Sequence, residues 1–257
     1  MKSFLNAKKP IITVILSQTD TVSIIEEIRK SLNQGAEAFC FQFERMAKDG
    51  RNDDALKMIF SEMRDKLVYA TNYPSDTNAQ LGISDEAIAE QLVKLAEYGA
   101  NLIDVRGDMF SHCNAEITMN DEAICKQKEL IDRIHDSGCE VLISSHVKDK
   151  NGNFVYLPSE TVVALATEHI RRGADISKIV TNADCLEELN ENIYTCSLLK
   201  KLNISSLFLC NGSHCYMHRR IGPLVQGGMF LVREDSINNQ PQPTISEARK
   251  ILDNFRN

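Results

Sequence analysis

The sequence predicts a (β/α)8, or TIM, barrel, and three observations lead to this fold class. A short apolar segment, a turn and an amphipathic segment recur eight times along the chain. The length of 257 residues is normal for one such barrel. No G-x-G-x-x-G follows the first apolar segment, which disfavours the alternative of an open doubly wound sheet. No linker or shift in composition interrupts the chain, so we expect a single domain over residues 1–257.

The predicted strands are apolar runs bounded by residues typical of turns. Their ranges are 10–17, 38–43, 66–72, 101–107, 140–147, 176–181, 205–211 and 228–233. Strands that are separated by helices pair in parallel, and eight such units close into a barrel.

The predicted helices begin at residues that suit a helix N-terminus, and most of them end before a glycine. The expected starts are Thr19 or Asp20, the Asp85-Glu86 pair after Ser84, Ser159 as an N-cap, and Thr244 or Ser246 for the last helix. The expected ends are at Gly35, Gly99, Gly138 and Gly173. The short basic cluster 218–220 is interpreted as a solvated helix start.

Composition excludes several classes of function. The formal charge of −7 argues against a nucleic-acid surface, which needs a net basic face. No apolar run is as long as a membrane span, and the first residues contain no signal-peptide core. The eight cysteines form no C-x-x-C pair, and no Cys/His set has the spacing of metal ligands. We therefore expect a reduced, cytoplasmic protein with neither disulfides nor a metal.

Active sites of such barrels lie at the carboxyl ends of the strands. That rule alone selects Gln42, Glu44, Asn72, Arg106, Asp108, His146, Lys178, Asn211 and the loop after the last strand.

Lys178 is the most informative candidate. In DISKIVT it alternates with Ile176 and Val180, and both faces of a barrel strand are covered. Its side chain either extends to the strand end, or it is a desolvated amine with a lowered pKa that can attack a carbonyl. His146 ends the preceding strand, one strand spacing of roughly 5 Å away. It is either a hydrogen-bonded structural residue or the group that takes and returns a proton.

Arg106 lies in IDVRGD, with Asp104 and Asp108 on its own face of the strand. It belongs either to a structural network of ion pairs, or it is a cation that binds a substrate carboxylate and lowers the pKa of Lys178.

Five segments together resemble one family. LIDVRGDMF, EVLISSHVK, GADISKIVT, HRRIG and the Q-P-Q-P loop are similar to type I 3-dehydroquinate dehydratases of the shikimate pathway, which serves aromatic amino acid biosynthesis. The resemblance implies a barrel that binds a small anionic keto substrate as a Schiff base, without a cofactor. A homodimer is one assembly that the resemblance allows for this protein.

The resemblance also implies roles for individual residues. Lys178 falls on the Schiff-base lysine, and His146 falls on the general acid/base histidine. Arg219 falls on the arginine that holds the substrate carboxylate, and Gln242 falls on the glutamine of the loop that closes over the substrate.

Other positions depart from the family pattern. Gln42 stands where the strand-two motif Glu-x-Arg-x-Asp has arginine, and Asn72 replaces a second arginine. Arg106 replaces the glutamate that orients the histidine, and Asn238 replaces the serine of the closing loop. Because an arginine is always charged, its field is expected to disfavour protonation of His146 and Lys178. We therefore expect weak or absent dehydration of 3-dehydroquinate.

Three functions remain open on this basis. The first is a dehydroquinate dehydratase with a divergent pocket, favoured by Arg219 and Gln242. The second is another Schiff-base lyase or aldolase for a different anionic keto compound, favoured by Arg106. The third is a non-catalytic ligand-binding paralogue, disfavoured because nothing structural requires both Lys178 and His146.

Overall fold

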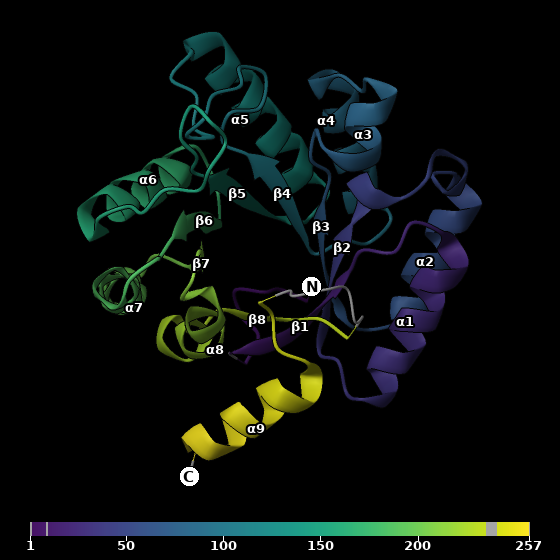
Figure 1. Cartoon of the computed structure of the whole chain (residues 1–257). Coiled ribbons are helices and arrows are strands. Elements are labelled where there is room, and N and C mark those ends of the chain that lie inside the picture. Colours follow the sequence, from purple (N-terminus) through teal and green to yellow (C-terminus); the bar gives the residue numbers. More distant parts are fainter. Residues whose placement is uncertain (1, 9, 235–240, 257) are drawn as a thin grey trace.

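The computed structural model describes residues 2–8, 10–234 and 241–256. Eight parallel strands surround a common centre, with helices outside them (Figure 1). The strands are β1 Ile11–Leu16, β2 Ala38–Gln42, β3 Leu67–Thr71, β4 Leu102–Arg106, β5 Glu140–His146, β6 Ile176–Asn182, β7 Ser206–Asn211 and β8 Met229–Val232. They are ordered β7-β6-β5-β4-β3-β2-β1-β8, which confirms the predicted (β/α)8 barrel.

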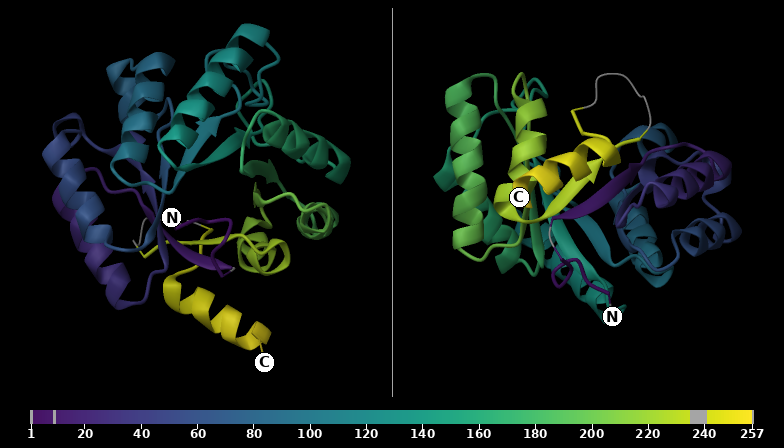
Figure 2. Two further views of the ribbon diagram at one scale, coloured as in Figure 1. Left: turned by 180° about the vertical axis from the view of Figure 1, so that it is seen from behind. Right: turned by 90° about the horizontal axis from the view of Figure 1, so that it is seen from below.

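The helices alternate with the strands and cover the outside of the sheet, as the views from behind and below show (Figure 2). They are α1 Thr21–Asn33, α2 Asp53–Met63, α3 Asp76–Leu81, α4 Asp85–Glu97, α5 Asp121–Asp136, α6 Ser159–Arg171, α7 Leu186–Lys201, α8 Cys215–Gln226 and α9 Ile245–Arg256. Two 3-10 turns, η1 Phe43–Arg45 and η2 Lys48–Gly50, and the short α3 were not predicted. None of the described helices is long and apolar enough to cross a membrane.

Helix caps follow the sequence in two cases and differ in a third. Asp20 accepts a hydrogen bond from the backbone of Ser23, and Ser84 accepts one from Ala87, as expected of N-caps. The prediction that Ser159 is an N-cap is wrong: it is the first residue of α6, and its hydroxyl contacts Glu191 and Thr195. The side-chain contact with α7 has replaced the local cap.

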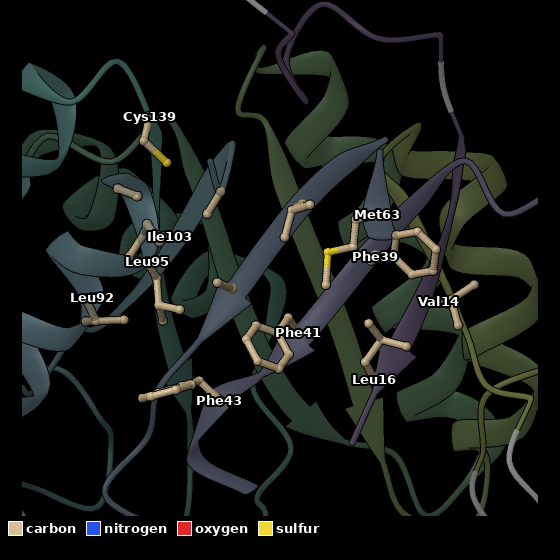
Figure 3. Packing of buried hydrophobic residues seen from close by; sticks show 14 of the residues in the cluster. Val14, Leu16, Phe39, Phe41, Phe43, Met63, Leu92, Leu95, Ile103 and Cys139 are labelled. Carbon is tan, nitrogen blue, oxygen red and sulfur yellow. The ribbon is translucent and has the colours of Figure 1, made fainter. Parts of the chain in front are cut away.

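Two apolar layers hold the sheet in place. Outward-facing side chains such as Val14, Phe39 and Phe41 pack against the helices (Figure 3). Inward-facing side chains such as Ile11 and Leu142 fill the barrel interior together with Phe4, which precedes β1. Full burial of one such side chain contributes about 1.5–3 kcal/mol. The interior is thus apolar toward the strand starts, which leaves polar chemistry to the opposite end.

The barrel is not hydrogen-bonded between β7 and β8 in the described residues; instead, α8 contacts the free edge of β7. The Gln226 amide accepts from the Phe208 backbone N–H at 3.0 Å and donates to its carbonyl at 3.4 Å. The Arg219 guanidinium donates through Nε to the Cys210 carbonyl at 3.1 Å. His218 and Arg219 are buried, so the interpretation of the basic cluster as a solvated helix start is wrong.

Candidate active site

Alternation along the central strands directs one set of polar side chains into the barrel. Ser144 of β5 lies level with Lys178 of β6 and with Arg106 of β4. Asp104 lies two residues before Arg106 and therefore faces the same way. Three neighbouring strands thus bring a lysine, an aspartate and a serine to one place.

The amine of Lys178 ends inside the barrel. Only 7% of the residue is exposed. Its Nζ lies 3.1 Å from Asp104 Oδ2, 2.6 Å from the Tyr73 hydroxyl and 3.2 Å from the Tyr69 hydroxyl. These contacts place the amine inside the barrel among polar groups, and its role as a nucleophile stays a prediction.

Asp104 is the centre of this cluster and is itself buried. It accepts hydrogen bonds from the hydroxyls of Tyr69 and Tyr73, and from Ser144 Oγ at 2.5 Å. Burial and the charge of Asp104 raise the pKa of both tyrosines well above the usual range. Both phenols are therefore neutral donors to the carboxylate, with oxygen lone pairs left to accept from Lys178.

His146 is oriented by a carboxylate from a loop. Glu116 Oε2 accepts from the His146 backbone N–H at 2.8 Å and from its Nδ1 at 2.7 Å. This contact assigns the proton to Nδ1 and leaves Nε2 as the free base. Burial and the charge of Lys178 lower the pKa of His146, against the opposing effect of Glu116. Although burial opposes it, the bonds to His146 lower the pKa of Glu116 to about 2.

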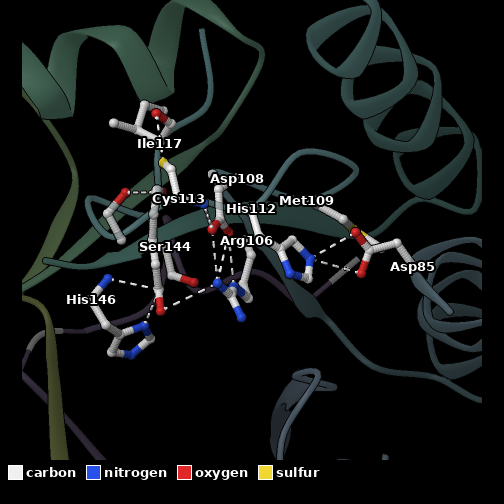
Figure 4. A network of polar contacts seen from close by, with 12 residues as sticks. Asp85, Arg106, Asp108, Met109, His112, Cys113, Ile117, Ser144 and His146 are labelled. Carbon is white, nitrogen blue, oxygen red and sulfur yellow. Dashed lines mark hydrogen bonds and ion pairs between the residues drawn. The ribbon is translucent and has the colours of Figure 1, made fainter. Parts of the chain in front are cut away.

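Arg106 is bound to two acids (Figure 4). Its Nε lies 3.0 Å from Asp108 Oδ1, its Nη2 lies 2.9 Å from Asp108 Oδ2, and Nη2 lies 3.4 Å from Glu116 Oε1. The positive charge is balanced within this group. The expectation that an unbalanced Arg106 disfavours protonation of His146 is therefore corrected, because Glu116 supplies a carboxylate that does the opposite.

The loop that carries Glu116 can approach because β4 is followed by glycine. A Cβ on Gly107 would lie 2.5 Å from the Glu116 carbonyl oxygen. That carbonyl accepts from Ser145 Oγ at 2.7 Å, and Glu116 itself has a positive φ of 47°. The strained backbone is held by these tertiary contacts.

The remaining predicted residues differ in whether their side-chain amides already have hydrogen-bond partners. Asn72 uses both ends of its amide, donating to Gln91 at 2.8 Å and accepting from Asn78 at 2.7 Å. The buried Oε1 atoms of Gln42 and Gln242 have no hydrogen-bond partner among the described residues. Asn238 lies outside the described residues. The assignment of these four residues to substrate binding stays a prediction.

Arg219 is a buried cation that, unlike Arg106, has no ion pair with an acid of the described residues. It is 7% exposed and donates to the Cys210 carbonyl and, at 3.3 Å, to Asn211 Oδ1. No carboxylate of the described residues forms an ion pair with it, and burial lowers its pKa. Because a buried charge without a counterion is costly, this position favours an anionic ligand.

Sequence reasoning missed Tyr69, Tyr73 and Glu116 as members of the site. Tyr69 could have been found, since it occupies an inward position of the predicted third strand. Tyr73 and Glu116 lie beyond strand ends, where no periodicity indicates which way a side chain points. No group of three or more His, Cys, Asp or Glu in the described part of the chain could hold a metal ion.

Comparisons with known proteins agree with the barrel fold. A family model described as type I 3-dehydroquinase matches residues 12–257. The structure of 3-dehydroquinate dehydratase from Geobacillus kaustophilus is similar with a TM-score of 0.80 at 13% identity, covering 100% of this chain and 96% of that chain. The type I enzyme of Clostridium difficile gives 0.77 at 17% identity, covering 97% and 93%. The enzyme of Enterococcus faecalis gives 0.74 at 14%, covering 97% and 95%. A search of curated protein sequences returned no match.

Proposed function

Because the chain belongs to the type I 3-dehydroquinase family, we propose that it is a Schiff-base lyase that converts 3-dehydroquinate into 3-dehydroshikimate and water. The observation that carries this proposal is the amine of Lys178, buried within reach of Asp104 and on the strand beside His146. The Clostridium difficile relative is described with covalently modified comenic acid, which is a precedent for covalent chemistry in this fold.

The proposed reaction uses Lys178 and His146 in turn. The neutral amine adds to the ketone carbon, and the resulting carbinolamine loses water to give the imine. His146 then removes a proton from the neighbouring carbon, and the C–H electron pair moves to form an enamine. The enamine expels a hydroxyl group from the next carbon. The departing oxygen takes that proton back from His146 and leaves as water. Water hydrolyses the imine and returns the free amine.

The ligand is proposed to be a carboxylate rather than a phosphate. Arg219 offers a buried positive charge that no acid among residues 2–8, 10–234 and 241–256 neutralises. Barrels often bind phosphate at the start of a helix near strands seven and eight. Here an acid lies next to the residues that precede α8: Asp184 Oδ1 accepts from the Ser213 backbone N–H at 2.9 Å. A phosphate there would meet a negative charge.

A second candidate is the same imine chemistry on another keto acid. It is favoured by the β2 and β3 side of the site, where Gln42 stands in place of a cation and Asn72 is occupied by Gln91 and Asn78. A buried site that lacks hydrogen-bond partners for the ring hydroxyls of 3-dehydroquinate discriminates against that substrate. Location in the cytoplasm, a homodimer and a single domain stay predictions from the sequence.

The test is borohydride trapping with 3-dehydroquinate, followed by mass spectrometry and an assay of product. We expect an adduct on the peptide that carries Lys178, and we expect it to disappear in Lys178→Ala but not in Lys201→Ala, an exposed lysine at the end of α7. An adduct without product would favour the second candidate. An adduct that survives Lys178→Ala would refute the assignment of the nucleophile.

A further inference from the structure

Tyr73 lies at the junction of the two reactive groups. Its hydroxyl is 2.6 Å from Lys178 Nζ and also donates to Asp104 Oδ2. Its ring packs edge-on against His146, with 5.4 Å between ring centroids. Among the described residues, no other side chain has a hydrogen bond or ring contact to each of Lys178, Asp104 and His146.

The hydrogen bonds around Lys178 define a direction for proton movement. An ammonium has three donors, and three oxygens surround Nζ: those of Tyr73, Tyr69 and Asp104. Each phenol donates its own proton to Asp104, so each can accept from the ammonium. An ammonium is not nucleophilic, so a proton on Lys178 must leave along one of these hydrogen bonds before the amine can attack.

We propose that Tyr73 is the catalytic proton carrier for imine formation at Lys178. A proton passes from the ammonium to the Tyr73 oxygen while the phenol proton passes to Asp104, which leaves a neutral amine and a protonated carboxyl. The amine then forms the C–N bond to the carbonyl carbon while the C=O π electron pair moves to oxygen. A proton passes from the nitrogen to that oxygen, which gives the carbinolamine. When the carbinolamine C–O bond breaks, the departing oxygen takes a proton from Tyr73, and Asp104 returns its proton to the phenol.

Tyr69 is the natural comparison, because it bonds to the same carboxylate oxygen. It lies within β3, is 1% exposed, and its hydroxyl is 3.2 Å from Nζ. Tyr73 follows the end of β3, is only partly buried and contacts the His146 ring. A leaving hydroxyl group at the mouth of the barrel is therefore within reach of Tyr73 rather than of Tyr69.

This inference rests on the proposed imine chemistry, and it is tested with a probe that does not depend on the substrate. Formaldehyde forms an imine with any accessible neutral amine, and reduction fixes it as a methyl group on Lys178. The rate of methylation at Lys178 would be measured by mass spectrometry in the full chain, in H2O and in D2O, for wild type, Tyr73→Phe and Tyr69→Phe. Trapping with 3-dehydroquinate would be run beside it.

We expect Tyr73→Phe to slow imine formation by about 10- to 100-fold, less than many acid/base losses because Asp104 still contacts Nζ. The solvent isotope effect on the methylation rate should be smaller in Tyr73→Phe than in the wild type. Tyr69→Phe should slow imine formation less than Tyr73→Phe does. A purely structural role predicts the opposite sign, since loss of an acceptor makes the ammonium easier to deprotonate. Equal rates in the two variants, or an unchanged rate in Tyr73→Phe, would overturn the inference. Failure of 3-dehydroquinate alone would count only against the proposed substrate.

Discussion

The two sides of the barrel mouth differ in whether their buried cations are paired with carboxylates. On the β4–β6 side, Lys178 is paired with Asp104, and Arg106 is paired with Asp108 and Glu116. On the β7 side, Arg219 is equally buried, and its hydrogen bonds within the described part of the chain go to a backbone carbonyl and a side-chain amide. Since buried charges are stable only when they are compensated, the first side is complete without a ligand and the second is completed by an anion. We propose that this difference separates groups that perform chemistry from a group that binds the substrate.

The largest expected effect is a loss of turnover on the β4–β6 side, in the variant His146→Ala. Imine formation at Lys178 should persist, whereas turnover should fall by about 10²–10⁴-fold because proton transfer at carbon is lost. Trapping and steady-state assays on the same preparation measure the two steps separately. His135→Ala, an exposed histidine bonded to Asp175, should turn over normally. Loss of activity on treatment with a chelator would contradict this role.

The pairing of Glu116 should be visible in the pH dependence of stability. Its pKa of about 2 in the folded protein is below the ordinary 4.5, so the unfolded chain binds a proton first as pH falls. Glu116 therefore contributes stability above about pH 4.5, on the order of 3 kcal/mol, which is lost as the pH falls toward 2.

Denaturant unfolding of Glu116→Gln measures this contribution. Between about pH 6 and pH 3 the wild type should lose on the order of 2 kcal/mol more than the variant. Glu122→Gln, at an exposed position of α5, should follow the wild type. Parallel curves for Glu116→Gln and wild type would show that the carboxylate is not held by His146.

The smallest expected effect is on the binding side, with Arg219→Met. A hydrogen-bonded charge contributes about 1.5–3 kcal/mol to binding, so kcat/KM should fall by about 10- to 100-fold, mainly through KM. Unfolding free energy should change by no more than about 1 kcal/mol, because no buried acid is left without a partner. Arg220→Met, which removes an ion pair with Glu247, is the matched control. A fall in kcat with unchanged KM would place Arg219 with the chemical groups instead.

Much of the scaffold of the site could be predicted from local pattern. Lys178 and His146 follow from period-two alternation on consecutive strands, and the observed register places them on adjacent strands facing the interior. Arg106 was located correctly on β4, but its effect was inferred wrongly. Its charge is balanced by Asp108 and by Glu116, a loop residue ten positions later in the sequence.

The sequence by itself determined the eight βα units, the order of the strands and which residues of the sixth strand share a face with Lys178. These properties depend on the spacing of apolar residues, which is a local feature of the chain. Only the tertiary structure decided that Glu116 orients His146, that Tyr73 joins Lys178 to Asp104, and that side chains of α8 bond to the edge of β7. Each of these contacts joins segments whose meeting is set by loop conformation and long-range packing, and no periodic signal in the sequence encodes them.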